Sequence, residues 1–398
     1  MSELSPAPAP IPRLTLKGPG SVKVGRGHLW VFSNDMLSVD DGAQQGGEVV
    51  VVTAKGEVAG TALFNRHALI MARIFSSRQE RFTPELLRQR LADAHQRRLQ
   101  QYPNRRTYRL VFSESDALPG LIVDQYEDVL SVQFLTLAMD MRRELIVQTL
   151  QELCSPRAIV ERSDSPARLN EGLQERKGLL YGELPEELVV DINGLKFRVD
   201  VMEGQKTGMY LDQVENWALM ERYAPGKKVL DLFCYVGGFS LNAARFGAAS
   251  VKAVDSSDAA LSQLMFNAHR NGLTDKIKAK KSDAFLYTRS QPEQFDVIVC
   301  DPPPFAKSRK QLDTALRGYR ELNRQCLKML NPGGILISIS CSAALSENDF
   351  DKMLGIAARD AARQIRLLPG GGQPVDHAPL LSMPETHYLK VRIVQAVD

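Results

Sequence analysis

Hydrophobic and polar positions follow three different patterns along the chain, and each pattern predicts a different kind of domain. Residues 13–75 hold short apolar stretches separated by turn-like residues, which is typical of a small all-β barrel. Residues 84–101 place leucines on one helical face and arginines on another, which predicts a helix that Pro103 ends. Strands and helices then mix as far as about residue 190, which predicts an α+β middle domain.

From Lys228 onward the pattern becomes regular, and apolar strands alternate with amphipathic helices. The predicted strands are Val229–Cys234, Ser250–Asp255, Ile277–Lys281, Phe295–Cys300 and Ile335–Ser340. Such alternation predicts an α/β fold with a doubly wound, mostly parallel sheet. A long helix is predicted over 313–330, and the sequence Asn-Pro-Gly-Gly at 331–334 is expected to stop it. Because ligands of such sheets bind beyond the carboxyl ends of the strands, we expect the chemistry there.

These patterns divide the 398 residues into four segments, since a chain of this length exceeds one ordinary core. Residues 1–12 are rich in Pro and Ala and are expected to be disordered. The barrel is assigned to 13–76, the middle domain to 77–190 and the α/β domain to 191–398. No apolar stretch approaches the roughly 18 residues of a membrane helix, and the N-terminus lacks the apolar core of a secretory signal. We therefore expect a cytoplasmic protein with no membrane partner.

Basic residues are unevenly distributed, although the net charge is only +3. Nine arginines lie in 76–110 and seven lysines or arginines in 302–330. Two basic segments suggest a polyanion-binding surface, while solvated helix faces explain either segment alone equally well. The barrel adds basic and aromatic residues: Lys17, Lys23, Arg26, His28 and Trp30. The five cysteines form no CxxC pair, which disfavours a disulfide framework or a metal site.

The segment Asp231–Ser240 links the first strand of the regular region to its helix. It lacks the GxGxxG pattern that cradles a dinucleotide pyrophosphate, and it begins with a carboxylate. That suits a cationic ligand without phosphates, such as S-adenosylmethionine. Gly237 permits a tight turn and a close approach of the backbone. We predict cofactor contacts from Asp231, Phe233, Tyr235 and Gly237.

Acidic residues after the next two strands extend this predicted cofactor site. Asp255 lies where it can accept both ribose hydroxyls, and Asp283 can accept the adenine amino group beside the apolar Ala284. A single Asp after a strand is more often a cap or turn residue. Three of them at successive strand ends, next to a Gly-Gly turn, favour a nucleoside cofactor.

The segment Asp301-Pro-Pro-Pro-Phe305 follows the fourth strand and forms a rigid loop. Phe305 can stack on a flat base, and Asp301 can accept a hydrogen bond from an exocyclic amino group. Asp301 is also a predicted cofactor contact. Cys341 ends the next strand among serines, where it is expected to face this loop. The other cysteines are interpreted as core residues: Cys154, Cys234, Cys300 and Cys326.

A thiolate at Cys341 would select one methylation chemistry. The C5 carbon of a pyrimidine is a poor nucleophile, but a thiolate that adds to C6 makes C5 enamine-like, so that C5 attacks a sulfonium methyl. A base then removes the C5 proton and the thiol leaves. Methylation of an amino group needs no such nucleophile. The alternative for Cys341 is a buried core residue without chemistry.

The polar, glycine-containing stretch 201–213 precedes the regular sheet and has two interpretations. It can fold over the cofactor as a lid, with Lys206 or Gln213 near the methionine end. It can equally be an ordinary linker between domains.

Together these motifs resemble the bacterial PUA-domain cytosine-C5 methyltransferases of large-subunit ribosomal RNA. The matching segments are Gly204–Gln213, Asp231–Ser240, Asp301–Lys307 and Ser340–Ser342, with Asp116–Asp124 in the middle domain. The resemblance runs from about Leu14 to Val394. It implies a PUA barrel, a middle RNA-binding domain and a class I, Rossmann-like methyltransferase domain. It also implies that Asp231, Gly237, Asp255, Asp283 and Gln213 contact S-adenosylmethionine and that Cys341 is the nucleophile.

The chain departs from the pattern of related enzymes at three places. Pro304 stands where other RNA cytosine-C5 methyltransferases have a second cysteine, so release requires another base, such as Asp301 or water. Val214 stands where relatives often have an arginine. The loop 301–305 also resembles the D/N-P-P-aromatic motif of amino-group methyltransferases.

The predicted function is formation of 5-methylcytosine in large-subunit (23S) ribosomal RNA through a cysteine–C6 adduct. Lys206, Phe305 and Lys307 are predicted substrate contacts. The barrel and the arginines of 76–110 are predicted to bind RNA in a salt-sensitive, weakly sequence-specific way. One alternative is methylation of an exocyclic amine of guanine or adenine, and another is a non-catalytic ribosome-assembly protein. The sequence leaves a homodimer open.

Overall fold

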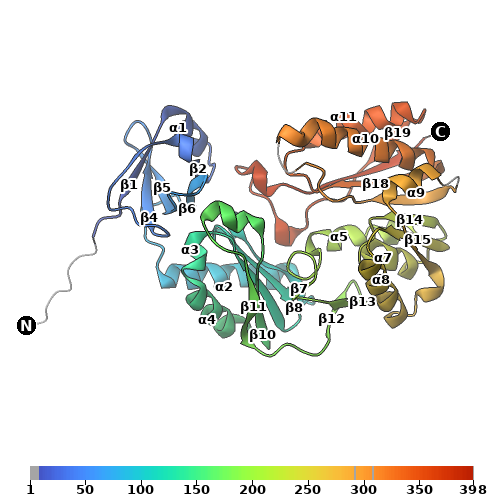
Figure 1. The fold of residues 1–398 in the computed structure, drawn as a ribbon, viewed down its shortest axis with the longest axis horizontal. Coiled ribbons are helices and arrows are strands. Elements are labelled where there is room, and N and C mark those ends of the chain that lie inside the picture. Colours follow the sequence, from blue (N-terminus) through green and yellow to red (C-terminus); the bar gives the residue numbers. More distant parts are fainter. Residues whose placement is uncertain (1–8, 291–292, 307–308, 398) are drawn as a thin grey trace, which may run out of the picture. The chain divides into compact units, whose positions relative to one another are not determined.

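The computed structural model describes residues 9–290, 293–306 and 309–397 (Figure 1). Contacts group the chain into two compact units. The first unit contains the residues up to Glu186 together with Asp200–Met209 and Pro379–Thr386. The second contains Glu187–Val199, Tyr210–Ala378 and the residues from His387 on. The domain boundaries at 76 and 190 stay predictions, and most of the N-terminal segment predicted to be disordered lies outside the described residues.

The N-terminal part of the first unit is a six-stranded sheet with the order β2-β6-β5-β4-β1-β3. Its strands are β1 (Arg13–Leu16), β2 (Trp30–Phe32), β3 (Met36–Val39), β4 (Glu48–Val52), β5 (Val58–Phe64) and β6 (Ile70–Ser76). Alternating apolar residues of these strands, such as Leu14, Val51 and Phe64, form its core. The prediction of strands alone missed one helix, α1 (Gly18–Gly25), whose first turn contains a proline that favours a helix start.

The middle part of the first unit is a five-stranded sheet with the order β11-β10-β9-β8-β7. Its elements are α2 (Pro84–Gln101), β7 (Thr107–Phe112), η2 (Ser113–Asp116), β8 (Leu121–Tyr126), β9 (Val129–Phe134), α3 (Leu137–Asp140), α4 (Arg143–Cys154), β10 (Ala158–Ser163), η3 (Pro166–Glu171) and β11 (Arg176–Gly182). Helix α2 has the predicted bounds because Thr83 caps its first turn by accepting from the Leu86 amide and its apolar face packs on this sheet.

The arginines of 76–110 are largely occupied by carboxylates inside the first unit. Arg98 Nη2 lies 2.7 Å from Asp116 Oδ2, and Arg109 Nη2 lies 2.8 Å from Asp124 Oδ2, with all four side chains less than a tenth exposed. Seven of the nine arginines have a carboxylate within 4.0 Å: Arg81, Arg88, Arg90, Arg97, Arg98, Arg106 and Arg109. The interpretation of this segment as an RNA surface is therefore wrong for the buried Arg98 and Arg109.

The second unit is built on a seven-stranded sheet with the order β16-β15-β14-β17-β18-β20-β19. Its strands are β14 (Lys228–Leu232), β15 (Ser250–Asp255), β16 (Ile277–Lys281), β17 (Phe295–Cys300), β18 (Leu330–Ser340), β19 (Ile365–Leu368) and β20 (Lys390–Ala396). The pairs among β14 to β18 are parallel, and β20 is antiparallel to both its neighbours. The predicted doubly wound α/β fold is confirmed. A hairpin of β12 (Leu188–Ile192) and β13 (Leu195–Val199) belongs to the same unit.

Helices cover both faces of this sheet (Figure 1). On one face lie α7 (Gly238–Arg245) and α8 (Asp258–Arg270), and on the other lie α10 (Leu312–Lys328) and α11 (Glu347–Asp360). Tyr319 of α10 and Phe350 of α11 pack into the core against the sheet. Shorter elements are η1 (Ser33–Asp35), η4 (Leu211–Gln213), α5 (Val214–Trp217), α6 (Met220–Tyr223), η5 (Thr274–Lys276), α9 (Ala284–Ser290), η6 (Arg309–Gln311), η7 (Val375–His377) and η8 (Pro384–Thr386). None of the described helices is both long and apolar enough to cross a lipid bilayer.

Two predicted boundaries are wrong. Strand β14 ends at Leu232 instead of Cys234, because Phe233 has a φ of 62° and cannot continue a strand. The Asn-Pro-Gly-Gly segment does not separate α10 from the next strand. Strand β18 begins at Leu330, and its pairing with β17 shifts register opposite this segment, where Gly333 has a φ of 74°. The turn-forming residues are therefore accommodated as an irregularity within the strand.

Candidate functional site

Five of the predicted site residues lie at one edge of the second unit's sheet. Asp231 is near the end of β14 and Asp255 ends β15, while Asp301 and Cys341 directly follow β17 and β18. Asp283 comes two residues after β16. Because these five strands are parallel, their carboxyl ends share an edge, as the sequence predicted.

The loop after β14 holds a strained backbone. Phe233, Tyr235 and Gly237 have φ values of 62°, 47° and 92°. A left-handed conformation costs a non-glycine residue about 1–3 kcal/mol, so two such residues persist only where the surroundings fix them. The next residue, Gly238, allows no side chain, since a Cβ there would lie 2.1 Å from Cε2 of Trp217. Tight packing thus fixes the loop at the edge where the cofactor is predicted.

Asp231 supports this loop from beneath. Its carboxyl group is 1% exposed, and Oδ2 accepts hydrogen bonds from the Ser240 amide at 3.0 Å and the Ser240 hydroxyl at 2.6 Å. Burial raises the pKa of Asp231 to about 7, although the Ser240 hydrogen bonds act in the opposite direction. Asp231 therefore ties the start of α7 to β14, and its contact with the cofactor stays a prediction.

Replacing Asp231 by asparagine is expected to change how stability depends on pH. The pKa of Asp231 is higher in the folded chain than its ordinary value of 3.8, so the native state binds the proton more tightly. Wild-type stability from this group is complete below about pH 4 and falls by as much as about 4 kcal/mol as pH rises through about 7. The amide does not titrate, so the variant lacks this decline. Denaturation followed by Trp217 fluorescence, with Trp30 replaced by phenylalanine, measures the difference. A stability difference that is constant between pH 4 and pH 8 would contradict the expectation.

Asp255 joins the loops after β14 and β15. Its Oδ2 accepts from the Tyr235 amide at 3.0 Å, and its Oδ1 accepts from the Ser257 amide at 2.9 Å. The half-buried carboxylate keeps further lone pairs for the predicted ribose contact.

Asp283 caps a helix, which is the alternative role that the sequence analysis gave for a single Asp after a strand. This exposed residue precedes α9, and its Oδ1 accepts from the Leu286 amide at 2.9 Å, as a helix cap does. The neighbouring Ala284 is buried in the core. The adenine contact of these two residues stays a prediction.

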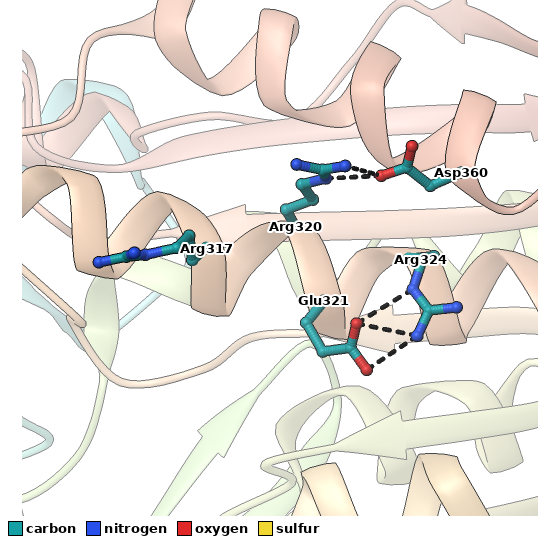
Figure 2. Close-up of a pocket in the computed structure, with 5 residues that line it drawn as sticks. All are labelled: Arg317, Arg320, Glu321, Arg324 and Asp360. Carbon is teal, nitrogen blue, oxygen red and sulfur yellow. Dashed lines mark hydrogen bonds and ion pairs between the residues drawn. The ribbon is translucent and has the colours of Figure 1, made fainter.

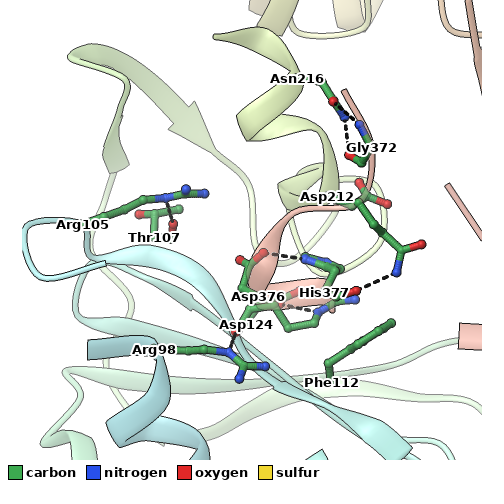
Figure 3. A network of polar contacts seen from close by, with 12 residues as sticks. Arg98, Arg105, Thr107, Phe112, Asp124, Asp212, Asn216, Gly372, Asp376 and His377 are labelled. Carbon is green, nitrogen blue, oxygen red and sulfur yellow. Dashed lines mark hydrogen bonds and ion pairs between the residues drawn. The ribbon is translucent and has the colours of Figure 1, made fainter. Parts of the chain in front are cut away.

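Asp301 is held in place by a chain of amide side chains. Gln213 Nε2 donates to Asp301 Oδ2 at 2.9 Å, and Asn216 Nδ2 donates to Gln213 Oε1 at 2.8 Å. Asn216 in turn exchanges two hydrogen bonds with the backbone of Gly372, as Figure 3 shows. The sequence pointed to Gln213 and Asp301 but not to Asn216. The network fixes the orientation of the Asp301 carboxylate.

The stretch 201–213, predicted to be either a lid or a linker, is divided between the two units. Its part within Asp200–Met209 belongs to the first unit, where Thr207 Oγ1 donates to the buried Asp124 Oδ2 at 2.5 Å. The rest belongs to the second unit. This division favours the linker interpretation. Lys206 lies in the first part, and its contact with the substrate stays a prediction.

Cys341 is surrounded by buried hydroxyl groups. The neighbouring Ser340 and Ser342 are fully buried and both bond the Tyr319 hydroxyl, at 3.0 and 2.9 Å. Cys341 itself is only partly buried, and its Sγ lies 4.0 Å from the carbonyl oxygen of Pro302. The thiol therefore faces the loop that begins with Asp301, as predicted.

The remaining cysteines differ from Cys341 in their surroundings. Cys234, Cys300 and Cys326 are buried, which confirms their interpretation as core residues. Cys154 is partly exposed as a residue, yet burial of its thiol raises the pKa to about 12. Cys234 and Cys300 also lie near the carboxyl ends of strands but are buried, and Cys154 belongs to the first unit, so Cys341 is the partly exposed cysteine at the predicted edge.

Phe305 is less available than the sequence suggested. Its ring lies 4.6 Å from that of Tyr319 and 6.0 Å from that of Phe285, between centroids. It is half-buried, so stacking on a base would use its remaining exposed face. Lys307, the neighbouring substrate contact predicted from the sequence, lies outside the described residues.

Sequence reasoning missed two residues close to Cys341. Burial raises the pKa of Tyr210, and Cys341 and Asp301 are among the neighbours that raise it further. Lys390, on β20, is 3% exposed and also has Cys341 as an ionisable neighbour. Tyr210 lies inside a motif that the sequence singled out, and Lys390 is one of two basic residues, with Arg392, in an otherwise largely apolar stretch. Each offered a weak signal.

A pocket of about 230 Å³ on α10 and α11 does not belong to this site (Figure 2). It is lined by Arg317, Arg320, Glu321, Arg324 and Asp360. Two of its arginines are paired with its two carboxylates, Arg320 with Asp360 and Arg324 with Glu321. The basic segment 302–330 thus presents less free charge than its composition implies.

Comparison with known proteins places this geometry in a family. A family model described as S-adenosylmethionine-dependent methyltransferase matches residues 172–367, and a PUA-like domain matches residues 14–77. Ribosomal RNA large subunit methyltransferase I of Shewanella denitrificans is 39% identical over 387 residues, which cover 95% of this chain and 98% of the relative. The chain belongs to the ribosomal RNA large subunit methyltransferase I family. The family protein of Tolumonas auensis is 38% identical over 381 residues, which cover 94% of this chain and 96% of the relative.

Solved structures share the fold of the family. SMU.776, a methyltransferase complexed with S-adenosylhomocysteine, has a TM-score of 0.83 at 23% identity, covering 96% of this chain and 99% of that chain. An S-adenosylmethionine-dependent methyltransferase from Streptococcus mutans has a TM-score of 0.82 at 22% identity, with the same coverage. The predicted PUA-like domain, class I methyltransferase fold and S-adenosylmethionine cofactor are confirmed for this member of the family.

Proposed function

We propose that this methyltransferase forms 5-methylcytosine in large-subunit (23S) ribosomal RNA through a covalent bond between Cys341 Sγ and the C6 atom of the base. The name of the relatives supports the RNA substrate. The position of Cys341 supports the C5 reaction: a partly exposed thiol, 4.0 Å from the Pro302 carbonyl, beside Asp301. Because the proposed substrate is ribosomal RNA, we propose that the enzyme acts in the cytoplasm. We propose no oligomeric state.

The residues at the sheet edge fit S-adenosylmethionine. The tight turn at Gly237 lets the backbone approach a ligand closely, and Asp255 offers carboxylate lone pairs to ribose hydroxyls. When bound, the cofactor supplies an electrophilic methyl group. We assign its binding to Gln213, Asp231, Phe233, Tyr235, Gly237, Asp255, Asp283, Ala284 and Asp301.

Cys341 and Asp301 divide the chemistry between them. The Cys341 thiolate forms a bond to C6, and the electron pair of the C5=C6 double bond becomes available at C5 to take the methyl group. Asp301, whose carboxylate Gln213 orients, then accepts the C5 proton. The electrons of that C–H bond restore the double bond and expel the thiolate. Asp301 thereby replaces the second cysteine of related enzymes, where this chain has Pro304.

The target base must leave its stack to reach Cys341. Phe305 and Lys307 come shortly after Asp301 in the sequence, beyond three prolines, and we assign them to binding the displaced nucleotide, together with Lys206. The PUA-like domain contributes further RNA binding.

Trapping with 5-fluorocytosine tests this function. Fluorine at C5 cannot leave as a proton, so the adduct persists after methyl transfer. Full-length enzyme, S-adenosylmethionine and transcribed 23S RNA containing 5-fluorocytosine are expected to give a denaturant-stable protein–RNA complex. Mass spectrometry of the digested complex should place the nucleotide on the Cys341 peptide. The same RNA with ordinary cytosine should give no stable complex.

Methylation of an exocyclic amine is the competing outcome. It would leave 5-fluorocytosine RNA untrapped and put the methyl group on a guanine or adenine amino group. That result would overturn the proposed C5 reaction while the cofactor assignment remained.

A further inference from the structure

The last strand of the sheet brings a buried lysine to the end of β18. In the antiparallel pairing of β18 and β20, Lys390 lies opposite Ser340, the residue before Cys341. Its side chain is 3% exposed. A lysine rarely occupies such a position, because burial of its charge is costly unless partners compensate. The position therefore requires a reason beyond packing.

The ammonium group of Lys390 is anchored by two backbone oxygens, one of which belongs to the residue after Cys341. Nζ donates to the Ser342 carbonyl at 2.9 Å and to the Tyr388 carbonyl at 3.0 Å. Both partners are acceptors, so these hydrogen bonds are consistent with a protonated lysine. The bond to Ser342 also fixes the backbone on the C-terminal side of Cys341.

The ionisable neighbours of Cys341 come from several elements. Asp301 lies in the facing loop, Tyr210 precedes η4, and Tyr319 belongs to α10. Lys390 itself is also near Glu347, which starts α11. Burial is the main cause that raises the pKa of both tyrosines, so they are neutral near pH 7. Lys390 therefore supplies positive charge near a thiol that faces the loop beginning with Asp301.

We propose that Lys390 is a positioning residue whose ammonium group keeps Cys341 as the thiolate and holds its backbone against the Asp301 loop. This inference rests on the proposed role of Cys341 as nucleophile. A nearby cation favours a thiolate over a thiol, and the effect is stronger away from bulk water. Burial lowers the pKa of Lys390 to about 8, while Cys341 and Glu347 oppose this lowering. The lysine thus remains mostly protonated at pH 7.

Alkylation of Cys341 as a function of pH tests the inference without RNA. Full-length protein is treated with iodoacetamide from pH 5 to pH 10, and mass spectrometry follows the Cys341 peptide. In the wild type, the midpoint of the rate profile is expected below about 8.5, the value of an ordinary thiol. Lys390→Met should move the midpoint up by about one pH unit and slow alkylation about tenfold at pH 7. Lys390→Arg, which keeps the positive charge, should have a midpoint close to that of the wild type.

Folding of the variants is monitored in the same samples. Cys300 and Cys326 are fully buried, so rapid alkylation of their peptides reports unfolding and disqualifies a variant. If Lys390→Met does not fold, the wild-type midpoint still tests the inference, together with the midpoint of Lys390→Arg. A wild-type midpoint at or above that of an ordinary thiol, or the same midpoint in folded Lys390→Met, would overturn the inference.

The outcome can be separated from that of the proposed function. A covalent adduct with 5-fluorocytosine RNA together with an unshifted Cys341 midpoint would refute only the role of Lys390. A low midpoint for Cys341 alkylation that rises in Lys390→Met, with no adduct on 5-fluorocytosine RNA, would refute the C5 reaction. The effect of Lys390 on the Cys341 thiolate would then still hold.

Discussion

Replacing Cys341 by alanine is expected to lower the rate of methyl transfer to ribosomal RNA by about 10³-fold or more, because removal of a covalent nucleophile leaves only binding and positioning to accelerate the reaction. The affinity for S-adenosylmethionine should change little, since the loop after β14 is held by Ser240 and Asp255 and not by the thiol. Initial rates with labelled cofactor and transcribed RNA measure the first effect. Calorimetry with the cofactor measures the second.

Cys154→Ala provides the matched control. Cys154 is the other partly exposed cysteine, but it ends α4 in the first unit and burial raises the pKa of its thiol to about 12. Its variant is expected to keep most of the activity. Full activity of the Cys341→Ala enzyme would contradict a cysteine-dependent reaction and favour methylation of an amino group.

Regular secondary structure in the second unit was predictable because its signals are local. The strands 250–255 and 295–300 were predicted with their observed bounds, since the positions of each strand that the parallel sheet buries are all apolar. The loop after β14 was harder. Its turn was expected from the glycines, but the left-handed conformations of Phe233 and Tyr235 depend on packing that residue types do not reveal.

The candidate site was predictable only where strands are parallel and consecutive. Asp255 ends a strand that the alternating pattern identified, and Asp301 and Cys341 directly follow two others, so their common edge followed from the fold class. Lys390 was missed because its position depends on an antiparallel pairing between β20 and β18, two strands far apart in the chain. Nothing near Lys390 in the sequence specifies that register.

The partners of the charged residues in the basic segment 76–110 could not be predicted from the sequence either. Its composition suggested a surface for RNA, yet Arg109 and Asp124 lie opposite each other in the β7–β8 pairing and are both buried. Composition counts charges but does not identify their partners. The ion pairs of this segment therefore concern the stability of the first unit more than the recognition of RNA.

Asp124→Ala is expected to lower the unfolding free energy of the first unit by about 3–5 kcal/mol, because it leaves a buried guanidinium without its carboxylate. Asp124 is fully buried and accepts from Arg109 Nε and Nη2, both at 2.8 Å, and from Thr207 Oγ1 at 2.5 Å. Urea denaturation measures the loss. With Trp217 replaced by phenylalanine, Trp30 is the remaining tryptophan, and its indole donates to Glu114 Oε1 at 2.7 Å within the same unit. Its fluorescence reports that unit alone.

An exposed carboxylate of the same unit, Glu203, provides the control that distinguishes the effect of burial from that of charge. Glu203 pairs with Lys177 at 2.7 Å, but its side chain is 71% exposed, so Glu203→Ala should cost no more than about 1 kcal/mol. The double variant Arg109→Leu with Asp124→Leu should recover part of the loss, because neither charge is then left buried alone. If Asp124→Ala and Glu203→Ala had equal effects, the buried pair would not be the element that stabilises β7, β8 and the Thr207 segment. A loss in Asp124→Ala that the double variant relieves would show instead that the arginine acts inside the fold, where RNA cannot reach it.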